Sequence, residues 1–509
     1  MTPADSDPSR GDSMNTVIRP ATTAAEVDRA ARAAHQAYLV SAAQTPATRA
    51  SWLTALAEAL RAHDDELVGL AAEETHLAEP RLRGELKRSA FQLDLFAQEV
   101  RTGVALDAVI DHADPDWGMG PRPDIRRVNV PLGVVGVFGA SNFPFAFSVM
   151  GGDSASALAA GCAVLHKIHG GHLRLGLRTA EIVVEALEKV GAPQGLFAVL
   201  EGREAATALV DHPLVKAIGF TGSTAGGRAL FDRAAARPEP IPFYGELGSI
   251  NPVFVLPAAW EHRWQEILTG YAGSFTMGMG QFCTKPGVLF VPDTGETEQV
   301  RTTLTSALAD APLAKLLTPG LRESFGQARD EVAALEGVQT LVAGSDEEVP
   351  DPTVLAVDAE QVRRNPEVLH REMFGPATVL VRYREAADLP ALAELMEGQL
   401  TATVHGDEED DSAALVGTLT GKAGRVLFNG WPTGVTVSYA QHHGGPYPAT
   451  TTNTTSVGTA SIGRFMRPVS YQDLPDAALP PALQEANPWG IARRVDGRFE
   501  PAESEGAGA

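Results

Sequence analysis

Residues 128–152 contain no Lys, Arg, Asp or Glu, and this uncharged stretch limits what the chain can fold into. A run of this length either spans a membrane or lies inside a folded domain. Five glycines, two prolines and Asn142 interrupt it, and Asp153 follows directly, so we expect no membrane span. Instead, LGVVGVFGA favours a buried parallel strand. SNFPF is expected to be a loop, and GGDSASALAAG a helix of small residues.

Apolar strands and amphipathic helices alternate along residues 130–225, an order typical of a doubly wound α/β domain. A second alternating region begins near Asn251, and helical spacing dominates residues 23–98. With 509 residues the chain is long enough for about three domains. The acidic run at 407–411 is expected to cap a helix and remain solvated.

The charge balance and the start of the chain argue against several partners. The chain has 41 Lys and Arg against 64 Asp and Glu, a formal net charge of −23. An acidic surface repels phosphate backbones, so we expect no nucleic acid partner. The first residues have neither a basic flank nor an apolar core, so we expect no signal peptide and a cytoplasmic protein.

Only two cysteines occur, Cys162 and Cys283, which excludes a disulfide framework and paired-cysteine metal sites. His166, His169 and His172 recur every third residue. Glycines interrupt this pattern and no carboxylate accompanies it, so we predict no metal.

Three side chains are candidates for chemistry, each with an ordinary alternative. Cys283 lies on a turn within GMGQFCTKPG and is either a nucleophile or a small buried residue. The second of these interpretations, a small buried residue, suits Cys162. Glu246 is a lone carboxylate in PFYGELGSINP, either a general base or a capping or salt-bridged residue. Glu372 precedes a Phe-Gly-Pro turn and is either a functional carboxylate or an ordinary surface residue.

The segment GFTGSTAGGRA contains the glycine spacing of a phosphate-binding loop between Gly222 and Gly227. Arg228 and Ala229 replace the Lys and Ser or Thr that a nucleoside triphosphate site requires. A diphosphate approaching a helix N-terminus stays possible, and an ordinary glycine-rich turn is the alternative.

Taken together, these segments resemble the aldehyde dehydrogenase superfamily. Within it, GQFCTKPG, HGGPYPATT and RPVSYQDLP resemble the branch of α-ketoglutaric semialdehyde (2,5-dioxopentanoate) dehydrogenases, whose relatives include NADP-dependent fatty-aldehyde dehydrogenases. The resemblance covers residues 17–475. The motifs occur in family order: SNFP at 141–144, Lys167, FTGSTAGG at 220–227, ELGSINP at 246–252, GQFC at 280–283, EMFGP at 372–376, and Asn429.

The resemblance implies a mechanism. Cys283 would attack an aldehyde carbon, Asn142 would hold the oxyanion with the backbone N–H of Cys283, and Glu246 would activate water to hydrolyse a thioester. Positions matching the cofactor contacts of the family are Lys167, Thr221, Gly222, Ser223, Gly227, Glu372 and Phe374.

One departure from the family bears on the cofactor. Many members that prefer NAD place a Glu three residues after the ribose-binding Lys, where this chain has Gly170. No carboxylate is then present to repel a 2′-phosphate, and His169, His172 and Arg203 offer possible partners for one. We therefore predict NADP as the cofactor, with NAD possible.

The resemblance also implies an aldehyde dehydrogenase-like α/β fold: a doubly wound cofactor domain, an α/β catalytic domain and a small β bridging element that pairs subunits into a homodimer or homotetramer. The expected boundaries are a flexible N-terminus at 1–16, the cofactor domain at 17–106 and 131–246, the catalytic domain at 247–445, the bridging element at 107–130 and 446–475, and a C-terminal extension at 476–509.

The substrate is left open between two kinds of small aldehyde. α-Ketoglutaric semialdehyde needs a cation at the far end of its tunnel, for which Lys285, Arg464 and the histidines at 442–443 are candidates. A medium- or long-chain aldehyde needs an apolar tunnel, for which the candidates are Phe143, Phe145, Phe147 and Trp431. A coenzyme A-acylating enzyme and a non-catalytic relative are further alternatives, which the presence of Glu246, Cys283 and Asn142 disfavours.

Overall fold

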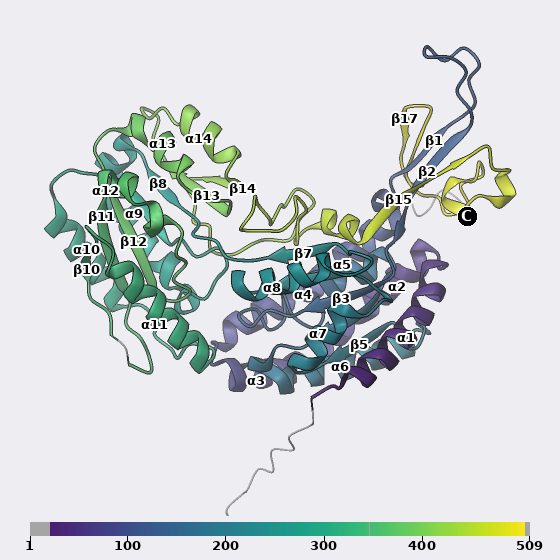
Figure 1. The fold of residues 1–509 in the computed structure, drawn as a ribbon, viewed down its shortest axis with the longest axis horizontal. Helices are drawn as coiled ribbons and strands as arrows, with labels where there is room; N and C mark the ends of the chain where they lie inside the picture. The colour runs from purple at the N-terminus through teal and green to yellow at the C-terminus, as the bar shows by residue number, and fades with distance from the viewer. Residues whose placement is uncertain (1–20, 346, 504–509) are drawn as a thin grey trace, which may run out of the picture.

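The computed structural model describes residues 21–345 and 347–503, which fold around three β-sheets (Figure 1). The segment predicted to be a flexible N-terminus, 1–16, lies outside the described residues. In Figure 1 the seven-stranded sheet and its helices lie at the left, a parallel five-stranded sheet lies in the centre, and a second five-stranded sheet projects at the right. The predicted α/β fold is confirmed.

The central sheet is parallel, in the order β5-β4-β3-β6-β7. Successive strands add on one side of β3 and then on the other, so a crevice opens at the carboxyl ends of β3 and β6, where ligands of such sheets bind. Its strands are β3 (Val134–Phe138), β4 (Ala163–Lys167), β5 (Phe197–Leu200), β6 (Val215–Thr221) and β7 (Phe243–Glu246).

Helices cover both faces of this sheet (Figure 1). The uncharged stretch predicted to be strand, loop and small-residue helix contains β3, a loop and the start of α5, and every residue of α5 is buried. The helices are α1 (Ala24–Ala42), α2 (Pro46–Ala62), α3 (Asp64–Thr75), α4 (Glu79–Thr102), α5 (Gly152–Ala160), α6 (Leu173–Lys189), α7 (Arg203–Asp211) and α8 (Thr224–Ala235).

The seven-stranded sheet has the order β10-β11-β12-β9-β8-β13-β14 and is parallel except for β10. Its strands are β8 (Val253–Val255), β9 (Val288–Pro292), β10 (Gln339–Val342), β11 (Thr353–Asp358), β12 (Ala377–Tyr383), β13 (Gln399–His405) and β14 (Ala423–Phe428). Its helices are α9 (Pro257–Thr276), α10 (Thr297–Ala309), α11 (Pro319–Ala333), α12 (Ala359–Arg364), α13 (Leu389–Glu394) and α14 (Ala413–Thr420).

The third sheet has the order β15-β2-β1-β16-β17 and differs from the predicted bridging element at both ends. β16 (Arg493–Val495) pairs with β1 (Ala108–Asp111), because the free edge of β1 offers backbone partners, and β17 (Arg498–Glu500) follows. The expected separate extension at 476–509 therefore contributes strands to this sheet. β15 (Met466–Gln472) pairs with β2 (Ile125–Pro131).

The segment 446–465, expected to belong to the bridging element, packs against β7 instead. Leu247 N–H donates to Ala449 O at 2.8 Å, and Thr451 N–H donates to Gly245 O at 3.0 Å. These bonds satisfy the open edge of β7. The glycine- and threonine-rich segment thereby becomes part of the wall around Glu246.

No helix among the described residues has both the length and the apolar composition needed to cross a bilayer.

The acidic run at 407–411 caps a helix, as predicted. The carboxylate of Asp410 accepts from the backbone N–H groups of Ala258 and Ala259, at 2.9 and 3.0 Å, in the first turn of α9. Glu408 beside it is exposed.

Asp410→Ala is expected to lower the free energy of unfolding by about 1 kcal/mol, the usual cost of losing a helix cap. Urea denaturation followed by circular dichroism measures it, with Glu408→Ala as the exposed control. Equal stabilities for the two variants would show that the cap does not contribute.

Candidate active site

Three side chains from separate segments meet where the central and seven-stranded sheets face each other. His443 Nε2 lies 2.9 Å from Glu246 Oε1 and 3.5 Å from Cys283 Sγ. Ser456 Oγ donates to the other carboxylate oxygen, Glu246 Oε2, at 3.0 Å. The side chains of His443 and Glu246 are 1% and 3% exposed, so they interact largely without screening by water.

The local backbone structure positions Glu246 and Cys283 in this cluster. Glu246 is the last residue of β7, at the carboxyl edge of the central sheet, opposite Thr221 of β6. Cys283 follows a turn in which Gly280 has φ +67°, and a Cβ on Gly280 would meet Gly375 O at 2.1 Å. Only glycine allows that approach, so the turn locks the segment containing Cys283 against the segment 372–376.

The electrostatics of the cluster shift the pKa values of Glu246 and Cys283 in opposite directions. Burial opposes ionisation of Glu246, but the nearby charge of His443 and hydrogen bonds from His443, Ser456 and Cys283 outweigh it and lower the pKa of this carboxyl below its usual value. Burial, and then the charge of Glu246, raise the pKa of the Cys283 thiol well above its usual value. The resting cluster is therefore a protonated thiol beside an ionised carboxylate.

Cys162 lies apart from this cluster, and the nearby charge of Arg49 opposes the effect of burial on its pKa. It is fully buried, its Sγ contacts Phe465 O at 3.4 Å, and burial raises its pKa to about 11. It packs behind the central sheet.

Asn142 lies in the loop after β3 and reaches the same cluster through Gln281. Its Nδ2 donates to Gln281 O at 2.9 Å, two residues before Cys283, and Arg81 Nη2 donates to Asn142 O at 2.6 Å. The amide is therefore placed beside the segment that contains the thiol. A role in holding an oxyanion stays a prediction.

Lys285 is not available as a substrate-binding cation. It is 2% exposed, and its Nζ donates to Met373 O at 2.7 Å and Ala377 O at 2.8 Å. Burial lowers its pKa to about 8, and the charge of Glu372 acts in the opposite direction. Lys285 instead fastens the segment 373–377, which follows Glu372, to the segment of Cys283.

Arg464 is also excluded as a substrate-binding cation. Its guanidinium forms an ion pair with Asp153 of α5 and lies over the ring of Tyr244, away from Cys283. Of the three cation candidates at the sequence level, only the histidine pair reaches the cluster, through His443.

The glycine-rich turn after β6 forms the second part of the site. Thr221 ends β6, and Ser223 Oγ accepts from Gly226 N–H at 3.3 Å as the cap of α8. A Cβ on Gly227 would meet Leu247 Cδ2 at 2.1 Å, so a larger residue there would have to displace that side chain. Gly222 and Ser223 are exposed at the N-terminus of α8 and fit a diphosphate.

Glu372 faces this turn from the other sheet. Its Oε2 lies 2.8 Å from the position that a Cβ on Gly248 would occupy, with Thr224 Oγ1 at 2.7 Å from the same point. Burial raises the pKa of Glu372 to about 7, opposed by Lys285 and a hydrogen bond from Ser249. Phe374 lies half-buried two residues further on.

The residues expected near a cofactor phosphate are two histidines, one buried and one neutral near pH 7, and three positions that are at least partly exposed, Lys167, Gly170 and Arg203. His172 is fully buried and its Nε2 hydrogen-bonds Ala140 O at 2.9 Å, so it is unavailable to a ligand phosphate, contrary to expectation. Burial lowers the pKa of His169 to about 4, so it is neutral near pH 7. Gly170 and Arg203 are exposed after the adjacent strands β4 and β5, and Lys167 ends β4, half-buried.

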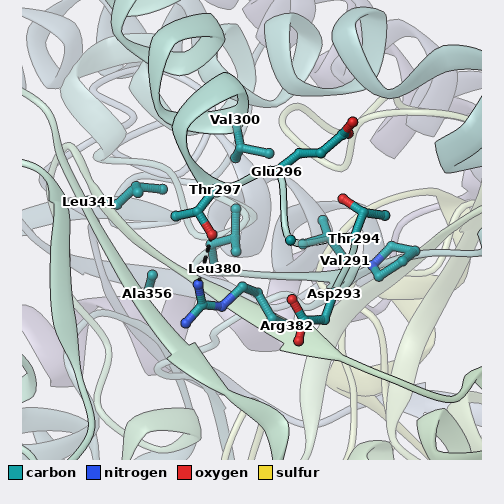
Figure 2. A pocket seen from close by; sticks show the side chains of 12 residues that line it. Val291, Asp293, Thr294, Glu296, Thr297, Val300, Leu341, Ala356, Leu380 and Arg382 are labelled. Carbon is teal, nitrogen blue, oxygen red and sulfur yellow. Dashed lines mark hydrogen bonds between the residues drawn. The ribbon is translucent and has the colours of Figure 1, made fainter.

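A separate pocket lies between the start of α10, the loop that precedes it and strands of the seven-stranded sheet (Figure 2). Arg382 donates there to Thr297 Oγ1 at 3.1 Å, and Asp293 and Glu296 flank it. None of the residues predicted for catalysis or cofactor binding lines it.

Two residues of the cluster's surroundings escaped the sequence-level interpretation. His443 was predicted only as one of a histidine pair that could bind a substrate carboxylate, and not as a partner of Glu246 and Cys283. Arg88 of α4 gave no signal within RLRGELKRS, because its helix shows an ordinary alternation of charged and apolar residues.

Comparisons with known proteins identify the family. Residues 4–466 match the aldehyde dehydrogenase family, so the chain belongs to it and is an oxidoreductase that oxidises aldehydes with NAD(P). It is 45% identical over 502 residues to alpha-ketoglutaric semialdehyde dehydrogenase 2 of Azospirillum brasilense, covering 97% of this chain and 95% of that one.

A second relative, alpha-ketoglutaric semialdehyde dehydrogenase of Acinetobacter baylyi, is 42% identical over 482 residues, covering 93% of this chain and 91% of its own length. The fold is similar to the crystal structure of an Escherichia coli NADP-dependent enzyme, with a TM-score of 0.73 at 24% identity, over 89% of this chain and 91% of the other. The resemblance to the family is thereby confirmed.

Glu246→Gln is expected to lower the pKa of Cys283, because the substitution removes the negative charge that helps to keep the thiol protonated. Alkylation of Cys283 by iodoacetamide at pH 8 should then be several-fold faster than in the unsubstituted protein. Mass spectrometry of the Cys283 peptide over time measures the rate. Glu58→Gln, on the exposed face of α2, is the control, and an unchanged or slower rate in Glu246→Gln would contradict the assignment of charges.

Proposed function

We propose that this chain oxidises α-ketoglutaric semialdehyde (2,5-dioxopentanoate) to 2-oxoglutarate, with NADP as the preferred cofactor. The observation that carries the chemistry is the contact of Cys283, His443 and Glu246 within one buried cluster. The two relatives that are 45% and 42% identical support the substrate through their names.

In the first step, the sulfur of Cys283 attacks the aldehyde carbon and the thiol proton passes to Glu246. A carbon–sulfur bond forms, and the carbonyl oxygen becomes an oxyanion, giving a thiohemiacetal. Asn142 and the backbone N–H of Cys283 hold that oxyanion. His443 holds Glu246 ionised beforehand, so that the carboxylate is ready to accept the proton.

The nicotinamide ring, when bound, supplies the hydride acceptor that converts the thiohemiacetal into a thioester. Glu246 releases its proton to solvent and then takes one from a water molecule, whose oxygen attacks the thioester carbon. The carbon–sulfur bond breaks, Glu246 returns the proton to the sulfur of Cys283, and the carboxylic acid leaves. Glu246 thus acts twice, and its contact with His443 supports both steps.

The residues that would hold the cofactor fit its parts. The exposed glycine turn at Gly222 and Gly227 and the N-terminus of α8 would hold the diphosphate. Lys167 would hold the adenosine ribose, Glu372 the hydroxyls of the nicotinamide ribose, and Phe374 would lie beside the ring.

A coenzyme A-acylating reaction is a weaker candidate, because it releases its thioester to a thiol and does not need a base for water. The ionised Glu246 beside Cys283 favours hydrolysis. The apolar-tunnel alternative loses two of its supports. Phe145 is 3% exposed in the core, and Trp431 packs on His405 with ring centroids 4.6 Å apart.

We further propose that the chain works in the cytoplasm as a homodimer or homotetramer assembled through the third sheet. That sheet projects from the rest of the molecule (Figure 1) and ends in the exposed edge strands β15 and β17. Edges of this kind are suited to pairing with a second copy.

The proposed function is tested by assaying 2,5-dioxopentanoate, short semialdehydes and neutral aldehydes with NADP and NAD. Cys283→Ala is expected to reduce oxidation by roughly 10⁴-fold or more, as removal of a covalent nucleophile does. Cys162→Ala is the matched control and should retain activity. Oxidation that survives in Cys283→Ala, or acyl-coenzyme A as the product when coenzyme A is added, would overturn the proposal.

Gly170→Glu is expected to lower the ratio of kcat/KM for NADP to that for NAD by at least roughly tenfold, because a carboxylate there repels the 2′-phosphate and binds the 2′-hydroxyl. A Cβ at Gly170 meets nothing within 4 Å, so the new side chain has room. Steady-state kinetics with both cofactors measure the ratio, with Lys189→Glu, an exposed position at the end of α6, as the control. A ratio that already favours NAD in the unsubstituted protein would contradict the NADP assignment.

A further inference from the structure

Arg88 of α4 has a guanidinium group whose outer nitrogens are buried without a partner. Its Nε donates to Val435 O at 3.1 Å, whereas Nη1 and Nη2 have no hydrogen-bond partner among the described residues. Buried guanidinium N–H groups are costly to leave unpaired, so such a group in a functional protein calls for a ligand or a bound water.

This guanidinium lies one aromatic ring away from the reactive cluster. Its Cζ is 5.3 Å from the ring centroid of Phe147, and that ring lies 6.0 Å from the ring of His443, whose Nε2 contacts Cys283. Burial lowers the pKa of Arg88, and its interactions with Glu85, Cys283 and Glu246 oppose that change. Arg88 therefore lies within electrostatic reach of the thiol that reacts.

The nearest carboxyl on the same helix does not neutralise it. Glu85 Oε1 accepts from the N–H groups of Phe145 and Ala146, at 2.8 and 2.9 Å, and forms no ion pair with Arg88. Burial raises the pKa of Glu85, opposed by Arg81, those two hydrogen bonds and Arg88. Glu85 is thus engaged by the backbone of the loop after β3.

A second guanidinium approaches from the seven-stranded sheet. Arg425 of β14 donates to Pro432 O at 2.7 Å and Gly434 O at 3.2 Å, and its buried Nε has no partner among the described residues. Arg88 and Arg425 therefore both donate hydrogen bonds to backbone oxygens of the same loop, residues 432–435. Glu85 and Glu246 act on Arg88 without hydrogen-bonding its outer nitrogens, so these buried N–H donors are left for an anionic ligand.

The side chains that pack against Phe147 and Val435, the two residues that Arg88 contacts, form an apolar wall. Leu95, Val437 and Val457 form a small buried cluster with Phe147 and Val435 packed against it. Such a wall suits the methylene groups in the middle of a short substrate.

We propose that Arg88 binds the distal carboxylate of the substrate and thereby selects ω-aldehyde acids over neutral aldehydes. The planar guanidinium offers two parallel N–H donors to a carboxylate, and Phe147 supports its plane. The inference rests on the proposed function, since it assumes that an aldehyde reacts at Cys283. It names a binding residue that none of the sequence motifs contains.

The test compares 5-oxopentanoate with pentanal, which has the same chain length without the carboxylate. In Arg88→Leu, kcat/KM for 5-oxopentanoate should fall roughly 100-fold, mainly through KM, as expected when one partner of a buried charge pair is removed. Its kcat/KM for pentanal should stay within about threefold, which also shows that the variant folds. Arg88→Lys, which keeps the charge and loses the fork, should fall between them.

Lys87→Leu is the matched control, because Lys87 is exposed on the same helix and its substitution also removes one positive charge. Glutarate should inhibit pentanal oxidation competitively in the unsubstituted protein and in Lys87→Leu, and lose that effect in Arg88→Leu. Equal losses for both aldehydes in Arg88→Leu would assign Arg88 a structural role and overturn the inference. So would an unsubstituted protein that does not prefer 5-oxopentanoate. Failure of the unsubstituted protein to oxidise 2,5-dioxopentanoate would refute the proposed function itself.

Discussion

The hydrogen bond between His443 and Glu246, 2.9 Å long and almost fully buried, is the interaction on which the rest of the site depends. A carboxyl at this depth would ordinarily be neutral, and a neutral acid cannot accept the proton of a thiol. His443 and Ser456 reverse that tendency. The ionised carboxylate in turn keeps Cys283 protonated until a substrate arrives, which protects a reactive thiol from other electrophiles.

Two sheets contribute opposite ends of their strands to the site. The central sheet contributes residues at the carboxyl ends of its strands, among them Glu246, as is usual for doubly wound folds. The seven-stranded sheet instead presents loops that precede its strands, with Cys283 before β9 and Glu372 before β12. Lys285 ties these two loops to each other through Met373 O and Ala377 O. One buried ammonium group therefore joins the loop of Cys283 to the segment that follows Glu372.

Much of the fold was predictable because strand and helix periods are local properties of the sequence. The stretch 128–152 predicted β3 and the start of α5 from its lack of charge together with its glycines and prolines, and the motifs around Cys283, Glu246 and Glu372 led to the family. Contacts between distant segments were not predictable in this way. Nothing local marks Arg88 as unpaired, shows that Lys285 is engaged, or joins β16 to β1, because each depends on a partner far away in the sequence.

The central claim is that oxidation proceeds through a thioester on Cys283 that Glu246 releases, and intact-protein and peptide mass spectrometry test it most directly. Glu246→Gln is incubated with 5-oxopentanoate and NADP, quenched in acid and digested. We expect an added acyl group on the Cys283 peptide that accumulates in the variant and not in the unsubstituted protein, because hydrolysis is slowed. No adduct in the variant, or an adduct on Cys162, would contradict the account.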